Sequence, residues 1–477
     1  LGDKGYPFPD IVSVPIVDDE TNIVDLEFRV NPGQRSMVRR INIRGNDNTN
    51  DEVYRRELRQ YESSLHNNSA IERSTVRIQR LKYVENVAVE KTKVPGSDDL
   101  VDLTFNIKER QAGEFKVSAG WSDTDGAIFD IKLQQDNFLG GGKNVGVIAS
   151  KNSVSSTLRF IFTDPYYSPD GISRSTNFSL TQTDVSSTST ATYVADTFGG
   201  GVFYLAPISE NESFGIGYDV KFTDFTTTIG SPIIVTHHIA DHGNTSIGLN
   251  LTGQYIYDTR DRTIFASKGN LFDVSPNLFF AADGASYAST TFSSENNTPY
   301  TLKTFGFDWN TVLQLKTRVG IGAGLFDATS LPFYSKYFAG GSRSVRGFKG
   351  ASLGPLTYDA PRNYPLPCAP KQVPGKFLKC DTVGGDFLTT AQANWVFPPP
   401  PFLGADTRTT RITLFADIGN VFEDVNDFDY NELRASYGIQ AQFMTPVGSV
   451  SIGFVNAFKS EEGDSTQPVI FSLGGGF

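Results

Sequence analysis

The feature that most constrains this chain is an alternation of apolar with small or polar residues that returns repeatedly after about residue 113. In residues 214–222, Phe, Ile, Tyr, Val and Phe alternate with Gly, Gly, Asp and Lys, and residues 433–444 repeat the pattern. Successive side chains of a strand point to opposite faces, so each run predicts a strand with one apolar face. The runs have about 9–12 residues, close to the roughly 9–11 that a tilted strand needs to cross a bilayer.

The distribution of apolar residues favours a membrane barrel over a soluble fold. A soluble sandwich has a dry interior and a charged exterior, whereas these runs pair an apolar face with a small or polar one. No stretch of 18 apolar residues exists, which argues against a transmembrane helix but not against a barrel. Because bacterial barrels have even strand numbers, we expect a 16-stranded antiparallel transmembrane barrel over 111–477. A large secreted sandwich or β-helix is the alternative.

A boundary near residue 110 is marked by charge. Residues 1–110 hold 36 charged residues, whereas the other 367 hold only 59. We expect a small mixed α/β domain over 35–110, in the order β-α-α-β-β, with helices over about 51–62 and from about 68. Residues 1–34 contain only a strand pair, which indicates the truncated tail of a similar preceding unit. The net charge of −11 argues against nucleic acid as a partner.

Motifs for catalysis or cofactor binding are not convincing. The run 140–143 hints at a phosphate loop, but Asn144 stands where Ser or Thr is required. His237, His238, Asp241 and His242 lie in a stretch that reads as a surface loop, so we expect incidental histidines rather than a metal site. No catalytic set stands out. We therefore expect no enzyme activity and no cofactor.

Several short motifs occur in one order along the chain. They are the run 338–348 with its Val-Arg-Gly-Phe signature, 134–140 with Gly142, 164–166, Asp261 and Arg262 with Phe265 and Gly269, 384–385, 417–419, and an alternating last strand that ends on Phe477. With them, essentially the whole chain resembles the BamA family of outer-membrane protein assembly factors. The N-terminal units would then be POTRA domains.

The resemblance implies a protein of the Gram-negative outer membrane, with POTRA domains in the periplasm, that folds and inserts barrel proteins. In the family a long loop, here about 327–384, threads back into the lumen, and its arginine pairs with an acid in the barrel wall. Here these are Arg346 and Asp417. The alternation agrees, because the strand 411–419 has its apolar residues at even positions, so Asp417 points inward. The expected lumen anchor comprises Val345, Arg346, Gly347, Phe348, Asp417 and Asn394.

Two positions depart from the family pattern. Asn394 stands where relatives commonly have a second acid, so Arg346 would have a single carboxylate. Ala266 replaces a family proline. The two cysteines, Cys368 and Cys380, lie in the long loop, and the oxidising periplasmic route favours a disulfide between them, with two free thiols as the alternative.

A barrel closes by pairing its first strand with its last, and this seam is expected to be weak. The last strand ends in three glycines, which are costly to order, and Pro468 removes a donor. An unpaired edge can template a client strand. The expected seam residues are Gly113, Phe115, Val117, Phe471, Leu473, Gly474, Gly475, Gly476 and Phe477.

The resemblance also implies partners. They are unfolded outer-membrane clients, outer-membrane lipid and accessory lipoproteins such as BamD, which would dock on the last POTRA domain. The expected docking residues on its first helix are Arg55, Arg56, Glu57, Arg59 and Glu62; an ordinary solvated face is the alternative. Two other functions stay open, a two-partner-secretion or autotransporter-assembly translocator of the same superfamily and a passive channel. The α/β module disfavours the channel.

Overall fold

The computed structural model describes residues 1–18, 23–185, 193–227, 231–304, 307–358, 380–399, 409–445, 448–461 and 464–474. The chain forms two compact units. One comprises Leu1–Glu114 with Gln134–Val145, and the other comprises Phe115–Leu133 with Gly146–Phe477.

The first unit is built on a three-stranded sheet in the order β3-β5-β4, in which β3 is parallel and β4 antiparallel to β5. Its elements are the 3-10 turn η1 (Gly2–Lys4), the hairpin β1 (Asp10–Asp18) and β2 (Ile23–Asn31), then β3 (Met37–Arg44), α1 (Asp51–Arg55), α2 (Asn68–Gln79), β4 (Val84–Lys93) and β5 (Leu100–Glu109). Leu103 and Phe105 of β5 are fully buried against Ile78 of α2 and Tyr54 of α1. The β-α-α-β-β order is therefore present.

The first helix is shorter than the sequence predicts. It ends at Arg55 instead of about residue 62. The backbone N–H groups of Arg59 and Gln60 donate to the Ser74 hydroxyl of α2 rather than only to carbonyls of their own helix. Ser63 then takes a left-handed conformation, with φ at +59°. Packing against α2 thus replaces the last helical turns, and Tyr61 is 63% exposed instead of facing the core.

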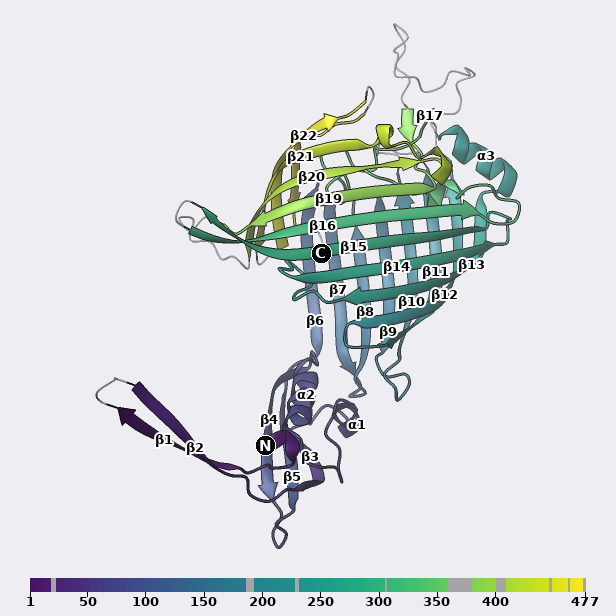
Figure 1. Cartoon of the computed structure of the whole chain (residues 1–477). Helices are drawn as coiled ribbons and strands as arrows, with labels where there is room; N and C mark the ends of the chain where they lie inside the picture. Colours follow the sequence, from purple (N-terminus) through teal and green to yellow (C-terminus); the bar gives the residue numbers. More distant parts are fainter. Residues whose placement is uncertain are drawn as a thin grey trace. The chain divides into compact units, whose positions relative to one another are not determined.

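The second unit is a closed barrel (Figure 1) in which each strand pairs with the barrel strands before and after it along the chain, and in which β6 pairs with β23. Its strands are β6 (Gly113–Ser122), β7 (Gly126–Phe138), β8 (Lys143–Lys151), β9 (Ser155–Asp164), β10 (Ser173–Asp184), β11 (Val194–Pro207), β12 (Glu212–Thr226), β13 (Thr245–Asp258), β14 (Gly269–Ala281), β15 (Tyr287–Thr304), β16 (Phe307–Gly324), β19 (Phe387–Phe397), β20 (Thr410–Phe422), β21 (Arg434–Thr445), β22 (Gly448–Lys459) and β23 (Val469–Leu473). The expected sixteen-stranded antiparallel barrel is confirmed. We call the end at which β6 begins the near end, and the opposite end the far end.

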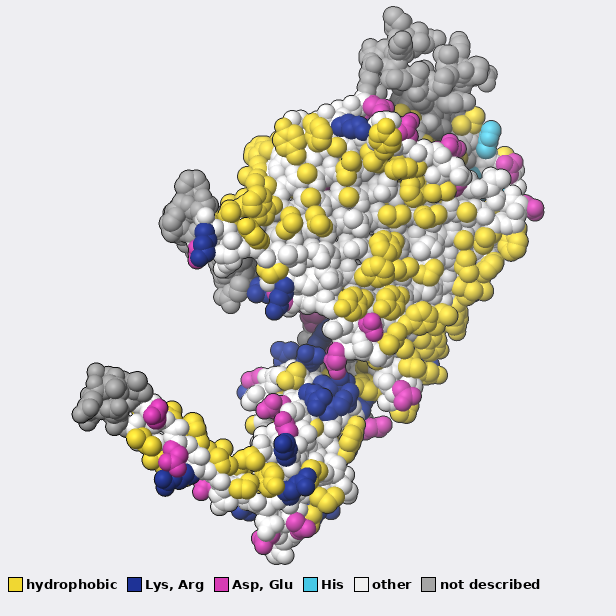
Figure 2. All heavy atoms as spheres, in the orientation of Figure 1, with side chains coloured by type: hydrophobic (Ala, Val, Ile, Leu, Met, Phe, Trp, Pro, Cys, Tyr) yellow, Lys and Arg dark blue, Asp and Glu magenta, His cyan; other side chains and the backbone are white. Residues whose placement is uncertain are grey.

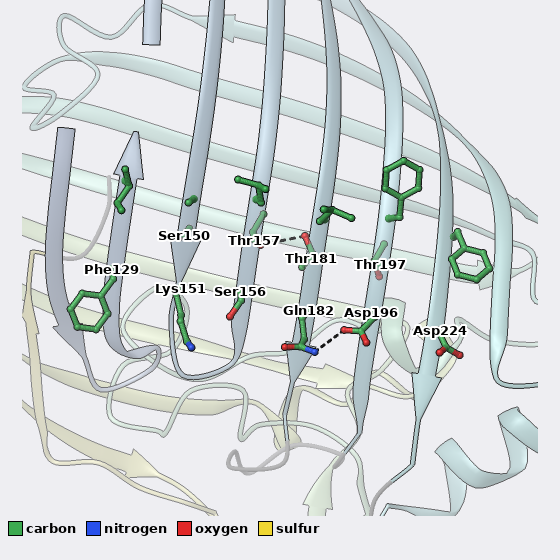
Figure 3. Close-up of a pocket in the computed structure, with 16 residues that line it drawn as sticks. Phe129, Ser150, Lys151, Ser156, Thr157, Thr181, Gln182, Asp196, Thr197 and Asp224 are labelled. Atoms are coloured by element: carbon green, nitrogen blue, oxygen red, sulfur yellow. Dashed lines mark hydrogen bonds between the residues drawn. The ribbon is translucent and has the colours of Figure 1, made fainter. Parts of the chain in front are cut away.

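The outer wall of the barrel is apolar, as the alternation predicts. Hydrophobic side chains cover the strands in Figure 2, and charged ones are sparse there. On β9 to β11, for example, Leu158, Leu180 and Phe198 are 48%, 53% and 52% exposed. A shallow hollow of about 740 Å³ lies on this face. Its polar residues Gln182 and Asp196 lie near the far ends of their strands and share a hydrogen bond of 2.9 Å (Figure 3).

The far end carries most of the irregular structure. The connection between β16 and β19 contains η2 (Phe333–Ser335), β17 (Leu356–Tyr358) and β18 (Cys380–Thr382), and the connection after β20 contains η4 (Val425–Asp427) and η5 (Tyr430–Glu432). Among the described residues, no helix is long and apolar enough to span a membrane.

The histidine stretch is a helix, α3 (Ile233–His242), and not the surface loop that the sequence predicts. His238 lies edge-on to Phe333 and Tyr334, with ring centroids 5.1 and 5.7 Å away, and Val235 is fully buried. The Nδ1–H of His242 donates a hydrogen bond of 2.9 Å to the Asp283 carbonyl. The β-branched residues of α3 disfavour a helix locally, so packing on these aromatic rings accounts for it.

Candidate functional site

The signature segment of the long connection lies inside the barrel. Val345 and Phe348 are 0% and 1% exposed. The Gln467 N–H donates to the Gly347 carbonyl at 2.7 Å, and the Gln392 side chain of β19 donates to the Ser344 carbonyl at 2.6 Å. Gly347 has φ at +89°, and a Cβ there would lie 2.7 Å from the side chain of Val455, so only glycine fits this turn.

Arg346 is held at the centre of the segment by Asp417 of β20. Its Nε donates to Oδ2 at 2.7 Å, its Nη2 to Oδ1 at 2.6 Å, and its backbone N–H to Oδ2 at 3.0 Å. The side chains are 6% and 0% exposed. Asn394 of β19 accepts a further bond from Nη2 at 2.6 Å. The structure thus brings together the arginine, the single acid and the asparagine that the sequence places there.

Two partners of Arg346 were not found from the sequence. Gln440 of β21 accepts from Nη1 at 3.1 Å, and the guanidinium lies 3.6 Å from the ring centroid of Phe415. Both face the lumen by the alternation of their strands, which is the signal that could have found them. A buried charge is costly unless it is paired and hydrogen-bonded. The Arg346 guanidinium meets this requirement through its two bonds to Asp417, its bonds to two amide oxygens and its contact with the Phe415 ring.

A second buried ion pair holds the start of the same connection. Lys336 lies 3.1 Å from the Asp386 carboxylate, with side chains 5% and 4% exposed. The other carboxylate oxygen accepts from the Leu331 N–H at 3.0 Å. The connection between β16 and β19 is therefore fixed to the barrel at two buried ion pairs.

Among the described residues, which end at Gly474, β6 and β23 have two register partners, Ser122 with Ser472 and Trp121 with Leu473. By contrast, β16 and β19 share ten. Phe115 and Val117, further along β6 toward the near end, are 69% and 61% exposed.

Glycines lie at the closest approach of the seam. A Cβ at Gly120 would be 2.5 Å from the Leu473 carbonyl oxygen, and one at Gly474 would be 2.6 Å from the Ala119 carbonyl oxygen. The Phe471 N–H donates to the Asp123 carboxylate at 2.6 Å instead of to a strand. Gly113 belongs to the first unit, whereas Gly475, Gly476 and Phe477 lie outside the described residues.

The five expected docking residues do not form one exposed helical face. Arg55, Arg59 and Glu62 are exposed, and Arg56 is half-buried. Glu57, however, is 5% exposed and pairs with Arg77 of α2 at 2.8 Å. Because α1 ends at Arg55, the residues after it follow turns. Glu57 therefore belongs to the interior of the first unit.

Other expected sites can be placed only in part. Cys380 begins β18, but Cys368 lies outside the described residues, so the disulfide stays a prediction. Within the described ranges, no group of three or more His, Cys, Asp or Glu side chains is placed to hold a metal ion.

Comparison with known proteins agrees with this architecture. BamA of Neisseria meningitidis serogroup B, an outer membrane protein assembly factor, is 28% identical over 509 aligned positions that cover 99% of this chain and 61% of the relative. BamA of Nitratidesulfovibrio vulgaris is 21% identical over 97% of this chain and 53% of its own length. The chain thus spans little more than half the length of these relatives.

Solved structures show the same fold. Haemophilus ducreyi BamA lacking POTRA domains 1–3 superposes with a TM-score of 0.80 at 26% identity, over 99% of this chain and 90% of that one. CdiB of Acinetobacter baumannii shares the fold alone, with a TM-score of 0.55 at 14% identity, over 98% and 78%.

Family models cover most of the chain. The POTRA model, described as a surface antigen variable number repeat, matches residues 36–110, and the Omp85 superfamily domain matches residues 137–477. The chain therefore belongs to the Omp85 superfamily, as an outer-membrane barrel preceded by a periplasmic POTRA domain.

Proposed function

We propose that this protein folds and inserts β-barrel proteins into the bacterial outer membrane, as the central subunit of an assembly machinery. The observation that carries the proposal is the seam, where the described residues of β6 and β23 share two register partners, against ten between β16 and β19. The similarity to BamA over 99% of the chain supports it. We infer that the work is done by strand binding, without a catalytic group.

We infer that a client strand binds at the seam through backbone hydrogen bonds. When the seam opens, the edge of β6 presents backbone N–H and C=O groups, which bind an incoming strand by main-chain hydrogen bonds and tolerate many sequences. Since the described residues of β6 and β23 share two register partners, few backbone bonds between them have to be broken when the barrel opens. The buried Arg346 anchor keeps the long connection inside the lumen while the wall opens on the other side of β23.

Reconstitution tests this function. The full-length protein in lipid vesicles should speed the folding of an unfolded outer-membrane barrel protein, read as protease-resistant, heat-modifiable product. Vesicles without it supply the control. If the client folds no faster in its presence, with the protein itself folded, the insertase proposal is wrong. If it instead releases a soluble partner across the membrane, the translocator alternative is supported.

Partner docking is proposed on the exposed charges that follow α1. Accessory lipoproteins, BamD among them, are the candidates by the resemblance. Reversal at Arg59, which is exposed, should weaken co-purification of such a lipoprotein, whereas reversal at the exposed Glu52 of α1 provides a matched control. Full co-purification after reversal of Arg55, Arg59 and Glu62 together would contradict docking at this face.

A further inference from the structure

A cavity of about 430 Å³ lies in the lumen toward the near end of the barrel. The connection between β13 and β14 contributes Thr263 to Ala266 to its lining, and the long connection contributes Ser342 and Arg346. The rest of the lining consists of inward-facing side chains of β15, β16, β19, β20 and β21. The volume is within the range of small-molecule sites, so the cavity is large enough for a small ligand.

Four cationic side chains line this cavity, and three of them have a carboxylate partner. The three ion pairs are Arg260 with Asp258, Lys316 with Glu295, and Arg346 with Asp417. The fourth cation is Arg411 of β20, which is 9% exposed. Its Nη2 donates to the Phe265 carbonyl, and its guanidinium lies 4.2 Å from the centroid of the Phe265 ring. Within the described part of the chain, Arg411 pairs with no carboxylate.

The acids near Arg411 are held by other groups. Asp261 and Glu295 act on Arg411 electrostatically without pairing with it. Asp261 accepts from the backbone N–H groups of Ser267 and Lys268 at 2.8 and 3.2 Å. Glu295 is already shared by two other cations. Because a buried charge without a partner is costly, Arg411 requires an anion that the described residues do not supply.

Two further hydrogen-bond donors lie beside Arg411. Gln442 of β21 is its register partner, so a neutral amide stands where a cross-strand carboxylate could pair with the arginine. Thr413, two residues along β20, has its side chain on the same face and is 4% exposed. Both side chains line the cavity, and neither is hydrogen-bonded to a described residue. The three side chains therefore offer N–H and O–H groups to one region of the cavity.

We propose that this cavity binds a small oxyanion, a carboxylate or a phosphate, through Arg411, Thr413 and Gln442. The planar guanidinium holds two oxygens of such a group, and the hydroxyl and the amide donate to the remaining lone pairs. The bound anion joins β20 to β21 beside the connection that carries Phe265. The inference rests on the geometry of the lumen and not on insertion activity, so the two can fail separately.

Thermal unfolding of the full chain in a nonionic detergent tests the site. Sodium phosphate and sodium acetate are each compared with sodium chloride at equal ionic strength. Occupation of the site should raise the melting temperature by about 2–4 °C, because the anion binds the folded protein and not the unfolded one. A rise with one anion alone identifies a site for phosphate or for carboxylate, and a rise with both identifies a site for either group.

Variants separate binding at this site from the general stabilisation that phosphate gives by its exclusion from protein surfaces. Arg411→Gln should lose the rise in melting temperature. Arg343→Gln, which removes a side chain that is 77% exposed, should keep it. Equal rises in the wild type and in Arg411→Gln, or no rise with either anion in the wild type, would overturn the proposal.

A second variant keeps the arginine and tests the site even if Arg411→Gln does not fold. Gln442→Glu places a carboxylate directly opposite Arg411. The melting temperature in chloride should therefore rise, and the response to phosphate and acetate should disappear. Gln111→Glu adds the same charge at an exposed position of the first unit and should keep the response. A full response in Gln442→Glu would show that the anion binds elsewhere.

Discussion

At the scale of single residues, the buried pair of Arg346 and Asp417 carries the sharpest prediction. Removing one member leaves a buried charge uncompensated, so Arg346→Ala and Asp417→Asn should each lower barrel stability by about 3–5 kcal/mol. The double variant should cost much less than the sum, because the second change removes the charge that the first one stranded. A double-mutant cycle on thermal unfolding in detergent measures this. Simple additivity would show that the two residues are not coupled.

Two variants control for this cycle. Arg343 lies in the same segment, but its side chain is 77% exposed, and its pair with Asp125 should contribute less than about 1 kcal/mol. Arg343→Ala should therefore change the melting temperature little. Arg346→Lys keeps the charge but cannot form the two-bond fork, so it should fall between the wild type and Arg346→Ala.

The sequence predicts which side chains of this site face the lumen, but not which of them contact the long connection. Alternation alone places Asp417 and Asn394 in the lumen, since a strand has only two faces. It does not say which lumen residues meet the loop. Gln440 of β21 and Phe415 of β20 both contact Arg346. Which lumen residues contact Arg346 depends on how deeply the signature segment enters the barrel. Depth is set by tertiary packing, which leaves no periodic signal.

At the scale of elements, strands were predicted better than helices. The alternating runs identify barrel strands such as β12 and β21, because a lipid-facing side must be apolar along its whole length. The helix α1 does not continue to residue 62, because Ser74 of α2 accepts from the N–H groups of Arg59 and Gln60. The helix α3 forms although Ile233 to Thr236 favour strands. Both outcomes depend on contacts with distant parts of the chain.

The helix α3 should loosen in acid. Burial, with the nearby His242, lowers the pKa of His238 to about 4, below its ordinary value of 6.5. The folded state therefore favours neutral His238. Its contribution to stability is complete above pH 6.5 and is lost as the pH falls toward 4. Hydrogen-exchange protection of the α3 amides should drop between pH 7 and pH 5.

Two histidine variants separate this effect from general acid sensitivity. His238→Phe keeps an aromatic ring in place and should remove most of the pH dependence. His237→Gln, at an exposed position on the same helix, should retain it. If the protection of α3 does not change with pH in the unmodified protein, His238 does not control the helix.

Glu57 should act on the stability of the POTRA domain rather than on docking directly. It is buried beside Arg77. Glu57→Gln weakens a buried charge-assisted pair, so the domain should lose about 1–3 kcal/mol of unfolding free energy in urea. Glu52→Gln, at an exposed position of α1, should cost much less. Equal midpoints for the two variants would show that the Glu57 pair does not stabilise the domain.

At the scale of the whole molecule, the need to satisfy backbone hydrogen bonds in the bilayer explains which features of the barrel can be predicted from the sequence. A membrane barrel must satisfy every backbone group inside the bilayer, so its sheet must close. The alternating runs, together with the even strand number of bacterial barrels, then predict sixteen strands. The proposed weakness of the seam is a departure from that rule, and its only signals in the sequence are Pro468 and the glycines from 474 to 476.

The seam itself yields the last prediction. Ser122 and Ser472 are register partners across it, and both side chains face the lumen side of their strands. Cysteines at both positions, in a background with Cys368→Ser and Cys380→Ser, should form a disulfide, because opposed residues in a ladder have Cβ atoms about 4.5–5.5 Å apart. The crosslinked protein should keep its fold but lose client insertion, and reduction should restore it. Thr163 and Ser175, register partners within the closed wall between β9 and β10, give a matched pair whose crosslink should leave insertion unchanged. Full insertion by the seam-crosslinked protein would show that the barrel works without opening between β6 and β23.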